Sequence, residues 1–431
     1  MVAQFKALTT EISKGRRPVL LSGGKIVQTG GASAVADILI SADGRIANIG
    51  TKLDTGADTL RVDVSGMLIS PSFIDMHQHL DKTLTLPFTP NPSGTLQGAR
   101  EAFAVYARTA EPGDIYRRAR RTMQRCLSRG TTAIRSHINI DKDARFQGIE
   151  ALAKLRDEWS GTMTLQLVSF MLAHPKQDFD WLDANIDAAV ALGDVVGGTP
   201  AVSEAPDVYI DKLFAAAARA GKPVDLHLDE HLNTAALHFD AALDSVERYG
   251  MQGRTVFSHV SVLSALPRAE FEKIMQRMID LKVGAVTLPA ANLYLQGRDK
   301  DVLPPRGLTR VAELKRGGVT IAAASDNIQD PFVPTGTGDA LEIARWTLLA
   351  GHLHADELAD AHHMITAAPA TLMGLQDDHG LKPGAWADLV VTDCDATDTL
   401  VAGGADHIMV FAQGRLVSET SVALAEHDPA A

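Results

Sequence analysis

Hydrophobic residues in the middle of the chain recur as short apolar runs, each followed by an amphipathic Ala/Leu/Arg-rich stretch. This alternation, at intervals of roughly 30–50 residues, predicts strands that alternate with helices. The predicted strands are 68–75, 131–139, 164–172, 195–199, 224–228, 255–259, 284–288 and 320–324, and the predicted helices include 114–128, 146–158, 210–220 and 271–282. No glycine-rich dinucleotide fingerprint follows an early strand, so the pattern favours an α/β fold of the (β/α)8 TIM-like barrel type over an open sheet.

The two ends of the chain follow a different pattern. Residues 18–64 alternate in short apolar runs, and Asp43-Gly44 between two of them predicts a hairpin. Residues 381–417 repeat this turn-rich style. We therefore expect the ends, 1–66 and 376–431, to form one small discontinuous β-sandwich domain that encloses the catalytic barrel at 67–375.

His77 and His79 follow the first predicted barrel strand. Residues i and i+2 of a strand point to the same side, so the two imidazoles would converge and could begin a transition-metal site. Chance alone gives about half an H-x-H motif in a chain with 15 His. A second motif, His352-Leu-His354, lies in a stretch that the pattern predicts to be helical, where i and i+2 point apart, so we expect a structural role for it.

Other predicted strands also end in residues that carry chemistry. The second strand ends at His137, the fifth at His227 with Glu230 beyond it, the sixth at His259 and the eighth at Asp326. The carboxyl ends of barrel strands all open on one face, where barrel active sites are built. These scattered residues are therefore expected to be neighbours of the His77 and His79 pair.

Composition and charge narrow the class of protein. The 431 residues are 45% hydrophobic and 22% charged, as in a soluble globular protein, and the net charge of −12 argues against nucleic acid or an anionic membrane as partner. Residues 1–17 contain no apolar stretch of signal-peptide length, and no later run is long enough to span a membrane. We therefore expect no membrane association. Its two cysteines, Cys126 and Cys394, are far apart, which excludes a Cys-rich zinc site and predicts a cytoplasmic location. Any metal must be held by His and carboxylate.

On these residues the chain resembles the amidohydrolase superfamily, and within it the cytosine-deaminase-like branch. The resemblance covers essentially the whole chain, including His79-Leu-Asp-Lys82, the His227-x-x-Glu230 spacing and Lys382-Pro-Gly-Ala-Trp-Ala-Asp388-Leu-Val. Residues 324–339 are also similar to the N-isopropylammelide hydrolase of triazine breakdown. The resemblance implies a hydrolase that acts on carbon–nitrogen bonds other than peptide bonds.

The resemblance also implies a cofactor, one divalent metal ion per chain. Its expected ligands are His77, His79, His227 and Asp326, with water as the fifth. Binuclear relatives carry a carboxylated Lys at the end of strand three or four, and neither predicted strand end has a Lys here. Zinc or iron is expected, with manganese as a further candidate.

The expected catalytic residues are Glu230, His259 and Asp326. In such a site, Asp326 would take a proton from water and pass it to the departing amine, while Glu230 would protonate a ring nitrogen. His259 would hydrogen-bond the attacking water. Glu230 as a solvated loop acid is the alternative.

Three further residues are candidates for substrate binding: Lys82, His137 and Leu172. For Lys82 and His137, a structural role is as compatible with the sequence as contact with substrate. Leu172 stands where cytosine deaminase carries a Gln that reads the pyrimidine amide. A hydrophobic side chain cannot pair with that amide, so cytosine is expected to be a poor substrate.

The function predicted is a metal-dependent aminohydrolase that removes ammonia from an aminated heterocycle, such as a pterin, an isocytosine-like ring or a triazine. The alternative within hydrolases is cleavage of an N-alkyl amine or cyclic amide of a heterocycle. A catalytically silent barrel scaffold is the alternative of another class, and it is disfavoured because all the expected ligands are kept. The predicted partner is a small heterocyclic substrate, with no nucleic acid and no membrane, and a homo-oligomer is left open.

Overall fold

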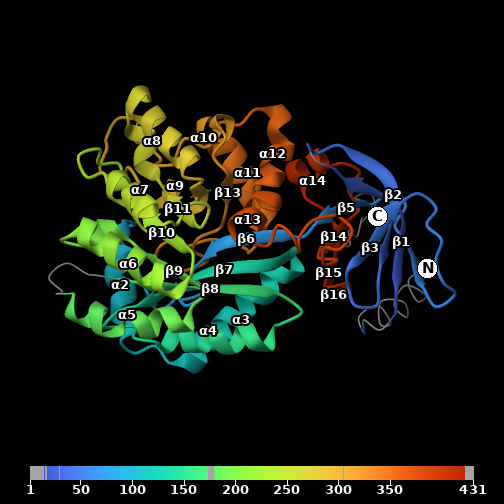
Figure 1. Ribbon diagram of the computed structural model, residues 1–431, viewed down its shortest axis with the longest axis horizontal. Coiled ribbons are helices and arrows are strands. Elements are labelled where there is room, and N and C mark those ends of the chain that lie inside the picture. The colour runs from blue at the N-terminus through green and yellow to red at the C-terminus, as the bar shows by residue number, and fades with distance from the viewer. Residues whose placement is uncertain (1–13, 15–16, 29, 173–178, 304, 423–431) are drawn as a thin grey trace, which may run out of the picture.

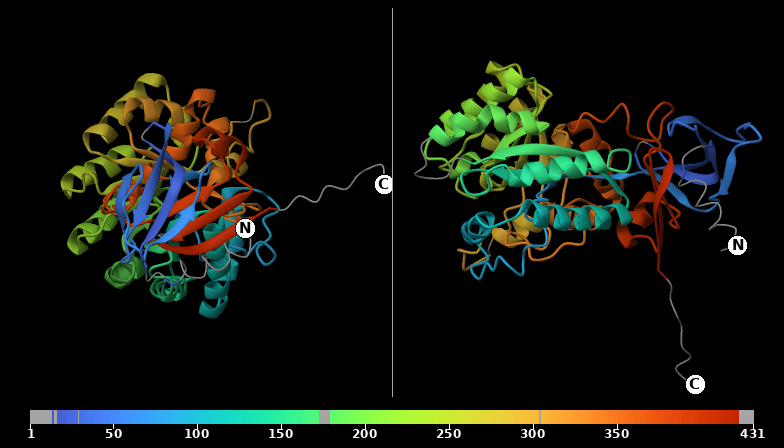
Figure 2. Two further views of the ribbon diagram at one scale, coloured as in Figure 1. Left: turned by 90° about the vertical axis from the view of Figure 1, so that its right-hand side faces the viewer. Right: turned by 90° about the horizontal axis from the view of Figure 1, so that it is seen from below.

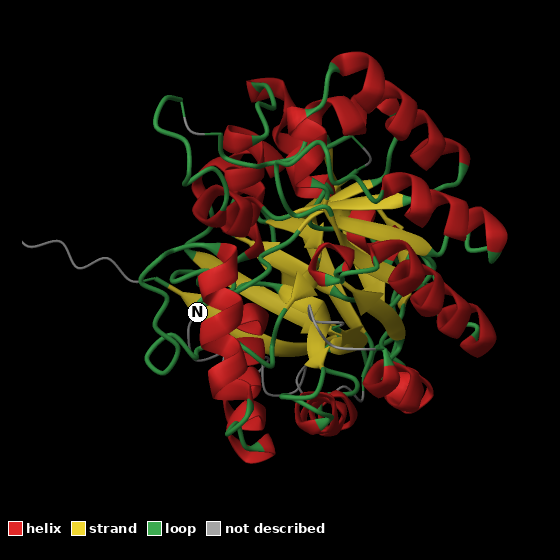
Figure 3. Ribbon diagram, turned by 90° about the vertical axis from the view of Figure 1, so that its left-hand side faces the viewer, coloured by secondary structure: helices red, strands yellow, loops and turns green. Residues whose placement is uncertain are grey.

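The computed structural model describes residues 14, 17–28, 30–172, 179–303 and 305–422 (Figure 1). Eight parallel strands form one sheet, the barrel, and helices surround it (Figure 3). In spatial order the barrel strands are β6 (Phe73–Gln78), β7 (Thr131–Ile140), β8 (Thr164–Met171), β9 (Val195–Gly198), β10 (Val224–Leu228), β11 (Thr255–His259), β12 (Gly284–Thr287) and β13 (Ile321–Ala323). The predicted (β/α)8 barrel is confirmed.

Amphipathic helices connect the strands. α3 buries Ile115, Ala119, Met123 and Cys126, a spacing that places one apolar face against the strands. The helices are α2 (Leu96–Ala107), α3 (Pro112–Ser128), α4 (Gln147–Glu158), α5 (Asp180–Leu192), α6 (Pro206–Ala220), α7 (Phe239–Arg248), α8 (Arg268–Asp280), α9 (Pro289–Leu295), α10 (Val311–Gly317), α11 (Ala340–Ala350), α12 (Leu358–His363), α13 (Ala367–Leu372) and α14 (Thr397–Gly403). Within the described ranges, every helix is too short or too polar to cross a bilayer.

A second sheet, the terminal sheet, joins both ends of the chain and packs beside the barrel (Figure 2). It is mixed, and Ile69 of β5 pairs with Val391 of β14, which brings residues far apart in the sequence together. Its strands are β1 (Val19–Val27), β2 (Ser33–Ile40), β3 (Ile46–Gly50), β4 (Leu60–Asp63), β5 (Leu68–Pro71), β14 (Leu389–Thr392), β15 (His407–Ala412) and β16 (Arg415–Ser421). The chain ends therefore form one β unit, as predicted, while the division at 66/67 and 375/376 stays a prediction.

The strands of the terminal sheet nearest the barrel are apolar on both faces. Leu389 and Val391 belong to the core of the terminal sheet, whereas Val390 between them belongs to the core around the barrel. Successive side chains of a strand point to opposite faces, so β14 contributes to two cores at once. This explains its uninterrupted apolar sequence.

The first predicted barrel strand, 68–75, is divided in the structure. β5 ends at Pro71 in the terminal sheet, and β6 begins at Phe73 in the barrel, where the Phe73 amide donates to Gly130 O at 2.9 Å. Because β6 leaves directly from the terminal sheet, the amino ends of the barrel strands face that sheet and the carboxyl ends open on the far side (Figure 1).

The barrel closes beside the carboxyl end of β6. A parallel bridge joins Gln78 to Asp326. The Asp326 amide donates to His77 O at 2.8 Å, and the His79 amide donates to Asp326 O at 3.1 Å. The closing seam is thus made by backbone of the same residues whose side chains were predicted to carry chemistry.

Candidate active site

The backbone turns sharply at several of the strand ends that carry the candidate side chains. His259, Asp326 and Asp229 have φ values of 67°, 64° and 50°. This left-handed region disfavours residues with a Cβ, and such conformations cost about 1–3 kcal/mol each and cluster at functional sites. Local strain therefore marks the same strand ends that the sequence pattern indicated.

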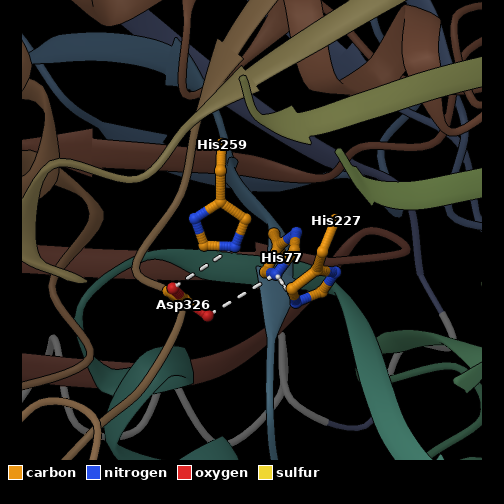
Figure 4. Close-up of side chains that lie close together, drawn as sticks. All are labelled: His77, His227, His259 and Asp326. Carbon is orange, nitrogen blue, oxygen red and sulfur yellow. Dashed lines mark hydrogen bonds and ion pairs between the residues drawn. The ribbon is translucent and has the colours of Figure 1, made fainter. Parts of the chain in front are cut away.

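Four side chains from the ends of β6 and β10 and from the closing seam bring their donor atoms together (Figure 4 draws three of them with His259). His227 Nε2 lies 3.2 Å from His77 Nε2 and 3.1 Å from His79 Nε2. Asp326 Oδ1 lies 3.5 Å from His77 Nε2 and 3.2 Å from His79 Nε2. We call these four residues the His/Asp cluster.

The spacing of the cluster suits a divalent metal ion. Ligands at about 2.0–2.1 Å from a tetrahedral zinc ion are separated by about 3.3 Å, which the observed 3.1–3.5 Å distances bracket. Asp326 Oδ1 is buried and lacks a hydrogen-bond partner among the described residues. Close imidazole nitrogens beside an unsatisfied carboxylate oxygen fit a shared cation. His259 can also be grouped with His77, His227 and Asp326 within 4.8 Å.

Burial keeps two imidazoles of the cluster, those of His79 and His227, neutral. It lowers the pKa of His79 to about 4, with the charge of Lys82 as a second cause, and it holds the pKa of His227 well below the ordinary value. For Asp326, burial raises the pKa, yet the neighbouring imidazoles of His77 and His79, and after them that of His259, hold it well below the ordinary value. Neutral imidazoles and an ionised carboxylate are the protonation states that bind metal.

A buried network beneath the cluster fixes the ring of His77. Ser258 Oγ donates to Asp225 Oδ1 at 2.9 Å, so its lone pair is left to accept from His77 Nδ1, also at 2.9 Å. Asp225 is in turn held by Arg135 Nη1 at 2.7 Å. With its proton on Nδ1, His77 presents the Nε2 lone pair to the cluster.

His79 has its own support. Its Nδ1 lies 2.9 Å from the backbone oxygen of His137 and 2.7 Å from Lys82 Nζ. Since a carbonyl can only accept, a proton on His79 Nδ1 leaves Nε2 free as a ligand. Lys82 is buried, and the rings of Phe103, Phe170 and Phe332 surround its ammonium at 5.3–5.8 Å.

A cavity opens over the cluster at the carboxyl ends of the strands. Polar and charged side chains from several elements line it together with aromatic and aliphatic ones. The lining residues are His79, Lys82, Leu96, Arg100, Phe103, Ala104, Ala107, Asn139, Asp141, Phe170, Leu172, Thr199, Val202, His227, Glu230, His259, Asp326, Asn327 and Phe332. Asn139 Oδ1 and Thr199 Oγ1 are buried polar atoms of this wall that lack a hydrogen-bond partner in the described part of the chain.

Glu230 and His259 lie side by side in this wall. Glu230 Oε1 is 3.7 Å from His259 Nδ1, and His259 Nε2 is 3.9 Å from Asp326 Oδ2. Burial raises the pKa of Glu230 to about 8 although Arg100 opposes the shift, and burial lowers the pKa of His259 to about 3. At neutral pH the site therefore contains a protonated carboxyl and a neutral imidazole.

The structure places the other predicted residues as follows. Lys82 and Leu172 line the cavity. His137 lies beneath it, stacked on the ring of His77 at 3.8 Å between centroids, so its contact with substrate stays a prediction. Residues 173–178, which follow β8 and Leu172, lie outside the described residues.

Sequence reasoning missed the contribution of α2. Leu96, Arg100, Phe103, Ala104 and Ala107 all line the cavity. Their spacing of i, i+4, i+7, i+8 and i+11 was a readable signal for one helical face. Nothing in that spacing indicated that the face would turn toward the site.

Comparison with known proteins identifies the family and the fold that this chain resembles. The sequence profile described as "Amidohydrolase family" matches residues 91–417. Pterin deaminase from Rhizobium rhizogenes is 30% identical over 392 residues, 89% of this chain and 88% of the relative. The crystal structure of 5-methylcytosine deaminase from Klebsiella pneumoniae has a TM-score of 0.86 at 25% identity, covering 96% of this chain and 100% of that chain. N-isopropylammelide isopropylaminohydrolase from Burkholderia multivorans has a TM-score of 0.79 at 28% identity, covering 94% and 100%.

Proposed function

The chain belongs to the amidohydrolase family, hydrolases that act on carbon–nitrogen bonds, and on this premise we propose that it deaminates an aminated nitrogen heterocycle. The proposed substrate is a pterin, an isocytosine-like ring or a triazine rather than cytosine. The reaction adds water to the ring carbon that carries the amine and releases ammonia.

One observation carries this proposal: the buried carboxyl of Glu230 faces the same cavity as the His/Asp cluster. Hydrolysis of a cyclic amidine needs a proton on the ring nitrogen next to the attacked carbon, and simple amide hydrolysis has no such requirement. Because its pKa is raised to about 8, Glu230 holds a proton that it can donate at neutral pH.

His77, His79, His227 and Asp326 are proposed to hold one divalent metal ion, zinc, iron or manganese. When bound, such an ion supplies Lewis acidity that lowers the pKa of water from 15.7 toward about 7. The residues beneath, Ser258 and Asp225, orient the ring of His77 for this task.

The proton transfers fall to three residues. Asp326 Oδ2, which faces His259, takes a proton from the attacking water and later delivers it to the leaving amine. Glu230 gives its proton to the ring nitrogen and regains one from the added hydroxyl as the product carbonyl forms. His259, neutral at the working pH, orients the water; with the Asn292 amide as placed, Asn292 Nδ2 donates to His259 Nδ1 and the ring proton is on Nε2.

The wall of the cavity supports a ring larger or less amide-like than cytosine. Leu172 offers no hydrogen bond to a ring edge, and Phe103, Phe170 and Phe332 add flat apolar surface. The unsatisfied atoms of Asn139 and Thr199 offer polar contacts elsewhere on the wall. Such a wall ranks substrates by about 1–3 kcal/mol per apolar group.

A second candidate is removal of an N-alkyl amine from a heterocycle. The likeness to N-isopropylammelide isopropylaminohydrolase favours it, because that relative is 28% identical over nearly the whole chain. The same His/Asp cluster and proton donor would serve either leaving group. The product separates the two candidates: ammonia for deamination, an alkylamine for the alternative.

The test is ammonia release by the full chain, stripped of metal and reloaded separately with Zn²⁺, Fe²⁺ and Mn²⁺. The panel contains pterin, isocytosine, aminotriazines, cytosine and N-isopropylammelide. Glu230→Gln is compared with Glu270→Gln, a substitution at an exposed helical position. Deamination that is lost in the first variant and kept in the second is expected; alkylamine release without ammonia would replace this proposal by its alternative.

A further inference from the structure

One face of α2 forms part of the cavity wall. The helix begins after Thr95, whose side chain accepts from the Gly98 amide at 3.1 Å. Phe103 and Ala107 of the same face are buried. α2 is an extra helix between β6 and β7, in addition to α3, so its residues are free to specialise for the site rather than for the barrel.

Arg100 is the charged residue on this face, and its guanidinium has no hydrogen-bond or ion-pair partner among the residues the structure describes. Other buried arginines are fully engaged. Arg118 donates to Asp114 and to the backbone of Asp81 and Thr83, and Arg135 donates to Asp225. A guanidinium has five N–H donors, and leaving them half-buried without acceptors costs free energy. An acceptor on a bound ligand would remove this cost for Arg100.

The charged groups around Arg100 leave its guanidinium available to bind a ligand. Burial lowers the pKa of Arg100, and the carboxyl of Glu230, when it is ionised, opposes this shift. Within the described ranges no ion pair joins the two side chains, which both line the cavity. The other cation of the wall, Lys82, lies 3.9 Å from Asp81 Oδ1. Asp141 and Asp326 are the remaining acids of the wall.

We propose that Arg100 is a substrate-recognition residue that binds an acceptor oxygen of the heterocycle, a carboxylate substituent or a ring oxo group. This rests on the proposed function, and it narrows the substrate class to rings that carry such an oxygen on the edge facing α2. Glu230 and Arg100 then contact two different edges of one ring. A guanidinium fork matches a carboxylate with two parallel hydrogen bonds and an oxo group with one.

The test is binding of deaminated rings, which the enzyme does not turn over. Uracil and 2,4-dioxopteridine are each used as the carboxylate, the carboxamide and the unsubstituted ring, with dissociation constants from calorimetry on the metal-loaded full chain. The variants are Arg100→Met, Arg100→Lys and, as a control, Arg121→Met at an exposed position of α3. Melting temperatures verify that each variant is folded.

If Arg100 binds a carboxylate, Arg100→Met should weaken binding of the carboxylate form about 10–100-fold, which is the range expected for a lost hydrogen bond to a charged group. Binding of the carboxamide form should weaken much less. Arg100→Lys should then recover part of the affinity, and Arg121→Met should change nothing. An oxo ligand predicts a loss of about 3–10-fold that is equal for all three forms of a ring.

Binding unchanged by Arg100→Met, or absent in the wild-type protein for every member of the panel, would overturn the inference. Its failure is separable from failure of the proposed function. Ammonia release without dependence on Arg100 refutes only the recognition role, and Arg100-dependent binding without ammonia release refutes only deamination.

Discussion

Glu230→Gln tests the proposed proton donor most directly, because it keeps the shape of the side chain and removes the acidic proton. With a pKa of about 8, the Glu230 carboxyl is about nine-tenths protonated at pH 7. A positioned proton donor contributes about 10²–10⁴-fold, so kcat should fall by at least about 10²-fold with metal content unchanged. Glu270→Gln should match the wild type.

The pH dependence tests the same carboxyl independently. In the wild type, activity should decline as pH rises above about 8, since the donor is then ionised. Arg100 lowers the pKa of Glu230, so Arg100→Met should move this decline to higher pH. The residual activity of Glu230→Gln should lack the decline.

Stability of the chelator-treated protein offers a third readout. Below pH 4.5 the Glu230 carboxyl is protonated in both the folded and the unfolded chain, whereas from pH 4.5 to about 8 it is protonated only in the folded chain. The free energy of unfolding therefore falls as pH rises through this window. The difference from Glu230→Gln should change by up to about 5 kcal/mol across this window, an order-of-magnitude figure from 1.36 kcal/mol per pKa unit. Urea unfolding at a series of pH values measures it. Parallel curves for the two proteins, with near-normal kcat in the variant, would refute the assignment.

Other substitutions test the remaining parts of the site. His227→Ala should abolish turnover and lower bound metal to near zero while circular dichroism stays unchanged; elemental analysis finding two tightly bound ions in the wild type would contradict the single site. Ser258→Ala, which removes the acceptor of the His77 Nδ1 proton, should weaken metal binding about 10–100-fold in chelator competition, and unaltered affinity would dismiss the network beneath the cluster. Cytosine should show a lower kcat/KM than pterin or isocytosine, and Leu172→Gln should narrow the gap; a wild-type preference for cytosine would show that the inference from Leu172 is mistaken.

The sequence predicted the barrel strands well because each one is a short apolar run, and several of them end in or beside a His or Asp. β10 and β11 begin and end where the pattern placed them, at 224–228 and 255–259. Buried parallel strands leave little freedom in such runs. The site residues followed from these ends, since barrel topology gathers them on one face.

Other features depended on tertiary contacts that the pattern does not contain. The run 68–75 is continuous in sequence, yet Pro71 ends β5 in one sheet and Phe73 starts β6 in another. The stretch 341–373 reads as helix but is broken into α11, α12 and α13, with His352 in a turn at φ 52°. The sequence did not indicate a role for Arg100, because that role depends on the tertiary structure. Only the structure shows that the guanidinium lines the cavity without a partner among the described residues.

The closing seam has a consequence for how the proposed metal ion would be acquired. The Asp326 amide is bonded to His77 O, and the His79 amide to Asp326 O, so the hydrogen bonds that close the barrel also set the positions of three proposed ligands. A chain whose last strand has not docked would have the three imidazoles of the cluster but not the carboxylate of Asp326. Metal binding would then require a closed barrel, and the metal content of a preparation would report the fraction of molecules whose barrel has closed.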